Sequence, residues 1–169
     1  SLDVGDGNAA FGYQSGKAVT TGDYNSLFGH KAGTALTAGS ENAAFGSEAL
    51  VAATAGNQSS AFGARSLVSA TTGERNTAMG FEALSKVVAG SNNTAVGWSA
   101  GFNNVGSGNV FIGYQAGYNE AGSNTLHIAN SSANTLIYGD FTAGRVGVGT
   151  VTPGVAFQVG NTGDGTVAR

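Results

Sequence analysis

Large apolar side chains recur along the chain about every 17 residues, each within a short motif that ends in glycine. The motif is an asparagine, replaced once by serine, then two small or apolar residues, the large apolar residue and the glycine. A second glycine follows each motif at a nearly constant distance. The two sets of glycines are Gly12, Gly29, Gly46, Gly63, Gly80, Gly97 and Gly113, and Gly22, Gly39, Gly56, Gly73, Gly90, Gly106 and Gly122. Two turn markers in every period indicate a repeat protein.

The sequence of each repeat predicts a short strand through the motif, followed by a glycine bend and a second short strand. A glycine turn then leads into the next repeat. Seventeen residues are too few for two helices and a turn, and abundant Gly, Ser, Thr and Asn disfavour helix. The predicted fold is therefore all-β, a parallel β-solenoid (β-roll) of about seven 17-residue rungs stacked about 4.8 Å apart. We expect residues 1–122 to form this repeat domain and residues 123–169 to form a short non-repeat β cap that closes its edge.

Equivalent residues of successive rungs stack into columns, and two of these columns carry packing predictions. We expect the large apolar residues of the motif, here called the apolar column, to line the interior. The apolar column is Phe11, Phe28, Phe45, Phe62, Met79, Val96 and Ile112. A small-residue column is expected to pack against neighbouring chains, because so thin a roll would leave it exposed. The small-residue column is Ser15, Ala32, Ala49, Ser66, Ala83, Ala100 and Ala116.

A third column alternates in charge through its middle rungs, and we call it the charge column. It comprises Gln14, Lys31, Glu48, Arg65, Glu82, Ser99 and Gln115. Because Arg65 stands between Glu48 and Glu82, we expect it to pair with both carboxylates, a structural role that avoids stacking of like charges. We expect no enzymatic activity, since general acid catalysis needs a carboxyl in a cleft. The alternative is a polysaccharide depolymerase, with a site between subunits built from Glu48, Glu82 or Glu120.

Composition narrows the possible partners. The chain has 29 glycines, 10% charged residues and a net charge of -3, so it has no basic stripe for nucleic acid. No apolar run approaches the roughly 20 residues needed to span a bilayer, and we expect no membrane insertion. There is no cysteine, and His30 and His127 lack further ligands at a recognisable spacing. We therefore expect no metal and no cofactor.

A column of mixed size, here called the aromatic column, follows the first glycine of each rung. It comprises Tyr13, His30, Ser47, Ala64, Phe81, Trp98 and Tyr114. If these side chains point outward, the C-terminal members form a patch that can stack on sugar rings or on a protein receptor. If they point inward, they fill the core of an assembly. The candidate binding patch is Phe81, Trp98, Phe102, Tyr114 and Tyr118.

Threonine recurs at one further position of the repeat and raises an ice-binding solenoid as a less favoured alternative. This threonine column is Thr20, Thr37, Thr54 and Thr71. A flat ice-binding face usually needs two parallel ranks of threonine. Only one rank is present, and it ends at Val88 and Val105.

The pattern Asn-x-Ala-apolar-Gly-x-x-Ala in residues 76–83 and 93–100 resembles the head repeats of trimeric autotransporter adhesins and related phage tail-fibre proteins. The resemblance covers about residues 5–122. It implies that three chains, each a left-handed parallel β-roll, pack about a common axis. The period here is 17 residues, longer than the roughly 14 of the familiar adhesin head.

A second resemblance lies in residues 124–130, 136–141 and 144–153, which are similar to the segment before the intramolecular chaperone (endosialidase-type) domain of phage tail fibres. It implies that the chain continues into such a chaperone after Arg169, or is cleaved there. Together the resemblances imply a structural and adhesive segment of a homotrimeric extracellular fibre, either a virion tail fibre or a similar cell-surface appendage. The expected partner is a host cell-surface glycan or protein receptor.

Overall fold

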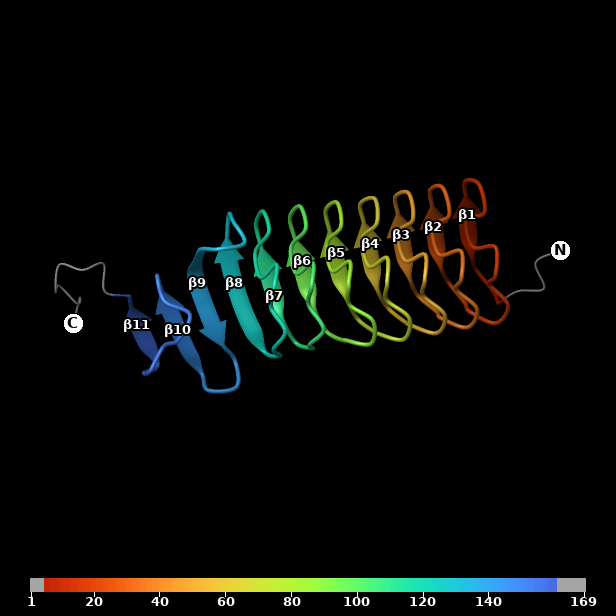
Figure 1. Cartoon of the computed structure of the whole chain (residues 1–169). Coiled ribbons are helices and arrows are strands. Elements are labelled where there is room, and N and C mark those ends of the chain that lie inside the picture. Colours follow the sequence, from red (N-terminus) through yellow and green to blue (C-terminus); the bar gives the residue numbers. More distant parts are fainter. Residues whose placement is uncertain (1–4, 161–169) are drawn as a thin grey trace.

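The computed structural model describes residues 5–160 and contains only strands, turns and bends in that range. Eleven strands lie side by side in one sheet in chain order, and the described chain runs from one end of the stack to the other (Figure 1). The strands are β1 (Ala9–Phe11), β2 (Ser26–Phe28), β3 (Ala43–Phe45), β4 (Ser60–Phe62), β5 (Thr77–Met79), β6 (Thr94–Val96), β7 (Val110–Ile112), β8 (Thr125–Ala129), β9 (Thr135–Asp140), β10 (Arg145–Val148) and β11 (Phe157–Val159).

The predicted β-solenoid of about seven 17-residue turns is confirmed. Strands β1 to β8 pair in parallel, with each motif aligned on the next, as in the pairing of Phe28 with Phe45. The pairing then changes: β8 with β9 and β9 with β10 are antiparallel, and β10 with β11 is parallel. The cap strands thus extend the same sheet. Residues 161–169, where the predicted junction with a chaperone lies, fall outside the described residues.

Each rung of the roll contains one three-residue strand, so the prediction of a second strand per rung is wrong. The residues after the first glycine form a turn in which the charge column has φ values between 49° and 59°. This left-handed conformation is incompatible with an extended strand. The compact turn returns the chain to the next rung through the second glycine.

The apolar column lies on the outside of the roll, and the prediction that it lines the interior is wrong. In a three-residue strand the side chains alternate, so the third residue lies on the face opposite to the middle one, and here the middle residue points inward. Leu27 and Ala44 are accordingly buried, whereas Phe28, Phe45 and Phe62 remain 38%, 36% and 39% exposed. The interior middle residues are Leu27, Ala44, Ala61, Ala78, Ala95 and Phe111.

The small-residue column packs inside its own chain, and its predicted role against neighbouring chains is also wrong. Ala32, Ala49, Ala83 and Ala100 are completely buried in the single roll. Small side chains are needed there because the turn and the strand approach each other across a thin interior. The column therefore needs no neighbouring chain to cover it.

The side chains that the strand and the turn contribute to this interior compensate for each other in volume. Where the strand contributes Leu27, the turn contributes Gly33, at which a Cβ would lie 2.9 Å from Leu27 Cδ2. Where the strand contributes Ala44, the turn contributes the buried Leu50. Phe111 is matched by a glycine, Gly117, whose Cβ would overlap the phenylalanine ring. In these rungs one large side chain fills the space, supplied from either side. In the rung of Ala95 both positions are small, and Leu84 and Phe111 of the adjacent rungs reach Gly101 instead.

A buried ladder of asparagines ties the rungs together, with asparagine replaced by Ser59 in one rung. Asn42 Nδ2 donates to Asn25 Oδ1 in the preceding rung at 3.1 Å and to the Gly56 carbonyl at 2.8 Å. The backbone N–H of Asn42 also donates to Asn25 Oδ1 at 3.0 Å. These bonds satisfy polar groups that the thin interior removes from water. The asparagine column is Asn8, Asn25, Asn42, Ser59, Asn76, Asn93 and Asn109.

Both glycine sets mark places where the backbones of successive rungs approach closely. At Gly29, φ is 143°, and a Cβ would overlap the carbonyl oxygen of Gly46 in the next rung. At Gly39 a Cβ would likewise overlap the Gly56 carbonyl. Only glycine allows stacking at both points, which explains the regularity of the two sets.

Candidate functional site

The outer face of the sheet carries a continuous uncharged strip along the roll. Phe28 and Phe45 stack with ring centroids 4.9 Å apart and planes within 5°, and Phe45 and Phe62 stack at 4.9 Å within 3°. Met79 and Val96 continue the apolar column at 46% and 39% exposure. Beside it, the first residues of the strands are half-buried and uncharged: Ser26, Ala43, Ser60, Thr77, Thr94 and Val110. An apolar strip of this length is typical of an interaction surface.

The aromatic column also points outward. Phe81 and Trp98 stack at 6.0 Å with planes within 16°, and Trp98 and Tyr114 stack at 5.1 Å within 12°. At the other end of the column, Tyr13 and His30 stack at 5.6 Å within 12°. The outward orientation considered from sequence is therefore the one found in the single chain.

The structure divides the five predicted patch residues between two stacks. Phe102 and Tyr118 lie four residues beyond the aromatic column and stack on each other at 5.0 Å, with planes within 5°. Lys86 Nζ lies 5.8 Å from the Phe102 ring centroid, a cation–π contact that the sequence analysis did not identify. The sequence spacing could have indicated this contact, because Lys86 lies one residue less than a full 17-residue repeat before Phe102.

The predicted pairing in the charge column is confirmed. Arg65 Nη1 lies 2.6 Å from Glu82 Oε1, and Arg65 Nε lies 3.9 Å from Glu48 Oε2. The Arg65 side chain is half-exposed, so these pairs contribute little to stability. Two of the three carboxylates considered for the depolymerase alternative, Glu48 and Glu82, are thus paired with one guanidinium.

The third carboxylate of that alternative, Glu120, belongs to a polar cluster where the last rung meets the cap. Glu120 Oε2 lies 2.8 Å from His127 Nε2, and His127 Nδ1 lies 3.0 Å from Thr135 Oγ1. The carboxylate accepts from Nε2–H, so in the neutral imidazole Nδ1 accepts the Thr135 hydroxyl proton. His127 is 7% exposed and packs edge-on against Tyr138 at 5.1 Å between centroids.

Electrostatics in this cluster shift two pKa values. The hydrogen bond from His127 lowers the pKa of Glu120. Burial of the carboxylate opposes this shift, whereas the backbone N–H of Gly122, which donates to Glu120 Oε1 at 2.6 Å, adds to it. Burial raises the pKa of Tyr138, and the charges of Glu120 and Asp140 add to the effect. The cluster was missed from sequence because Glu120 and His127 meet across a turn, with no motif spacing to indicate it.

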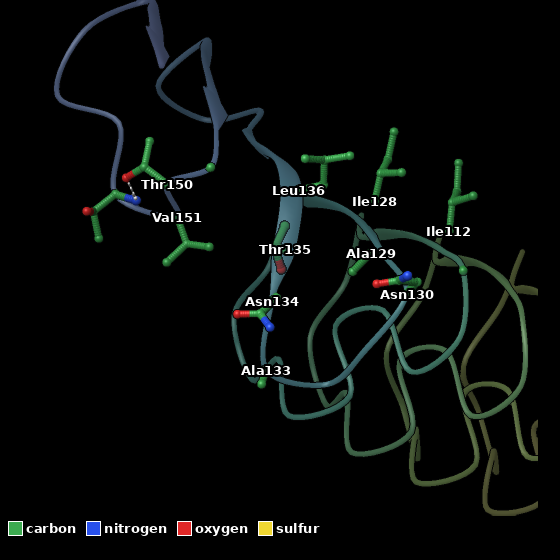
Figure 2. A pocket seen from close by; sticks show the side chains of 13 residues that line it. Ile112, Ile128, Ala129, Asn130, Ala133, Asn134, Thr135, Leu136, Thr150 and Val151 are labelled. Atoms are coloured by element: carbon green, nitrogen blue, oxygen red, sulfur yellow. Dashed lines mark hydrogen bonds between the residues drawn. The ribbon is translucent and has the colours of Figure 1, made fainter. Parts of the chain in front are cut away.

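An open pocket of about 940 Å³ lies where the apolar column reaches the cap. Ile112, Ile128 and Leu136 project side by side along one side of it, and the loop carrying Thr150 and Val151 forms the other side (Figure 2). Its remaining polar lining is uncharged and includes Asn130, Asn134, Thr135 and Thr152. Because Ile112 belongs to the apolar column, the pocket continues the uncharged strip.

The threonine column is bonded along the roll. Thr37 Oγ1 donates to the Thr54 carbonyl at 2.9 Å, and Thr54 Oγ1 donates to the Thr71 carbonyl at 3.2 Å. Each hydroxyl proton is therefore used within the protein.

Within residues 5–160, no group of three or more His, Cys, Asp or Glu side chains is arranged to hold a metal ion. In the same range no helix is long and apolar enough to cross a membrane. Comparisons of the chain with protein-family models, curated proteins and solved structures find no match.

Proposed function

We propose that the chain is a structural and adhesive segment of a homotrimeric extracellular fibre, a phage tail fibre or a similar cell-surface appendage. The observation that carries the proposal is the outward apolar column. A single roll leaves Phe28, Phe45 and Phe62 stacked against one another and open to water along one face. Association of copies along this face would remove that apolar surface from water.

The geometry of the roll suits a rod that extends a fibre. The strand register repeats from rung to rung, so the apolar strip runs along the length of the stack. Cyclic symmetry presents the same strip of every copy to a common axis. The number three comes from the resemblance of the repeat to trimeric adhesin heads and tail fibres.

Adhesion is assigned to the aromatic side chains outside the strip. Trp98 and Tyr114 are 42% and 51% exposed, and aromatic groups with a polar tip are common at binding surfaces. The partner we propose is a glycan or protein on a host or cell surface. In a trimer each site is present three times, so weak single contacts reinforce one another.

Native mass spectrometry of the purified chain tests the assembly. We expect a species of three times the mass of one chain that persists on dilution. A stable monomer or dimer at micromolar concentration would overturn the trimeric proposal. Binding of the fluorescently labelled trimer to host cells, compared with heat-unfolded protein, tests adhesion separately.

A further inference from the structure

The aromatic column is interrupted in its middle. Tyr13 and His30 stack at one end, and Phe81, Trp98 and Tyr114 stack at the other. The two rungs between them carry Ser47, which is exposed, and Ala64, which is half-exposed. We call these two rungs the break.

Stacking decides where on this column a ligand can bind. A sugar ring binds an aromatic side chain through the flat face of the aromatic ring. In Trp98 both faces are covered by its stacked neighbours Phe81 and Tyr114, at 6.0 and 5.1 Å. Trp98 therefore offers a ligand only its edge. The break, in contrast, leaves one face of His30 and one face of Phe81 uncovered by any ring of the column.

The dimensions of the break fit rings stacked in the same way. His30 and Phe81 are three rungs apart, about 14 Å at the rung spacing of a parallel sheet. Two additional rings at that spacing would complete the column. The neighbouring apolar column, with rings on three successive rungs 4.9 Å apart, shows that this roll holds an uninterrupted stack.

The polar groups beside the break favour an uncharged ligand with hydroxyl groups. Ser47 supplies a hydroxyl within it, and Glu48 and Arg65 directly follow the two break residues in the chain. Lys31, Glu48, Arg65 and Glu82 flank the region with balanced charge, which gives no net attraction for an anion or a cation. Carboxylates can accept hydrogen bonds from sugar hydroxyls, and guanidinium groups can donate hydrogen bonds to them.

We propose that the break between His30 and Phe81 is a binding site for a neutral saccharide, whose pyranose rings stack on the two free aromatic faces. Ser47 and Ala64 are small because the ligand occupies the volume of the two missing rings. The inference rests on the adhesive part of the proposed function and is independent of the number of chains in the fibre.

Saturation-transfer difference NMR with methyl β-D-glucopyranoside tests the site. This probe presents C–H groups on both faces of its ring. In the intact chain we expect saturation of its ring protons and shifts of the His30 and Phe81 resonances. A double variant, Ser47→Phe with Ala64→Phe, fills the break with stacked rings and is expected to weaken binding about tenfold or more. Phe81→Ala, which removes one wall, should also weaken binding.

The matched control is Val88→Phe, which adds the same side chain at an exposed position outside the aromatic column. It should leave glucoside binding unchanged, while circular dichroism shows that every variant is folded. Equal binding by the intact chain and the filled variant, or no binding by the intact chain, would overturn the inference. A trimer that does not bind the glucoside would refute this site alone, and a monomer that binds it would refute only the trimeric assembly.

Discussion

Asn93 donates from Nδ2 to Oδ1 of Asn76, one rung earlier, at 3.1 Å, and its backbone N–H donates to the same oxygen at 3.0 Å. Asn76 in turn donates from Nδ2 to the Gly90 carbonyl at 2.8 Å. Asn76→Ala would leave the buried N–H of Asn93 and the Gly90 carbonyl without these partners. We expect the free energy of unfolding to fall by about 3 kcal/mol, measured by urea denaturation. A loss below about 0.5 kcal/mol would show that the ladder is not a main source of stability.

Ser59 offers the opposite test, because it interrupts the same ladder. Its hydroxyl accepts from the Asn76 backbone N–H at 3.2 Å, but it is too short to reach the next glycine carbonyl as the asparagines do. Ser59→Asn restores an amide that can donate to the Gly73 carbonyl and accept from Asn76. We expect a gain of about 1 kcal/mol in urea denaturation. A destabilised variant would mean that this rung lacks room for the larger side chain.

Volume compensation predicts the cost of filling a glycine in the turn. At Gly117, φ is 58° and a Cβ would overlap Phe111, so Gly117→Ala combines backbone strain with overpacking. Gly144 has φ of 65° and no atom within 4 Å of its Cβ position, so Gly144→Ala carries the strain alone. We expect losses of about 3 kcal/mol and about 1 kcal/mol respectively in thermal unfolding. Equal losses would refute the packing argument.

The hydrogen bond between Glu120 and His127 makes the folding stability of the cap depend on pH in the acid range. The folded pKa of Glu120 lies below its ordinary value of 4.5, so the carboxylate stabilises the folded chain above that pH. This stabilisation is lost as the pH falls through the lowered pKa. Between about pH 5 and 3, the unfolding free energy of the wild type should fall more steeply than that of Glu120→Gln. Glu41→Gln removes a charge at an exposed carboxyl and serves as the control. If the unfolding free energies of the wild type and Glu120→Gln depend on pH in the same way, Glu120 is not the acid-sensitive group.

The same cluster predicts an effect at alkaline pH. The charge of Glu120 contributes to the raised pKa of Tyr138, after burial. Glu120→Gln should therefore lower the pKa of Tyr138 toward its ordinary value of 10.0, without reaching it. Ultraviolet absorbance of tyrosinate, with Tyr138→Phe to identify the signal, measures the shift. An unchanged titration would remove Glu120 as a cause.

Much of the roll could be predicted from the sequence because it depends on constraints that recur in every rung. The two glycine sets mark backbone approaches at which a Cβ would overlap the next rung, as at Gly29 and Gly39. The pairing of Arg65 with Glu48 and Glu82 followed from stacking residues one period apart. These predictions required only the period and the charge of the side chains.

The direction of side chains could not be read from their size. The large size of Phe45 predicts an interior position, but the three-residue strand turns its third side chain outward and its second, Ala44, inward. The missing interior volume comes from Leu50, six residues later in the turn. A large residue at one interior position is paired with a small residue six positions away, as in residues 27 and 33, 44 and 50, and 111 and 117. This pairing identifies the interior positions only once the location of the strand is known.

The central claim is that the outward apolar column joins copies of the chain. Sedimentation equilibrium of Phe45→Asp tests it, with Thr54→Asp as a control that adds the same charge at an exposed position outside the column. We predict that the wild type and Thr54→Asp sediment with three times the mass of one chain. Phe45→Asp should sediment as a folded monomer, because its side chain lies outside the roll interior. A Phe45→Asp protein that remains a trimer, or a wild type that is monomeric, would contradict the account.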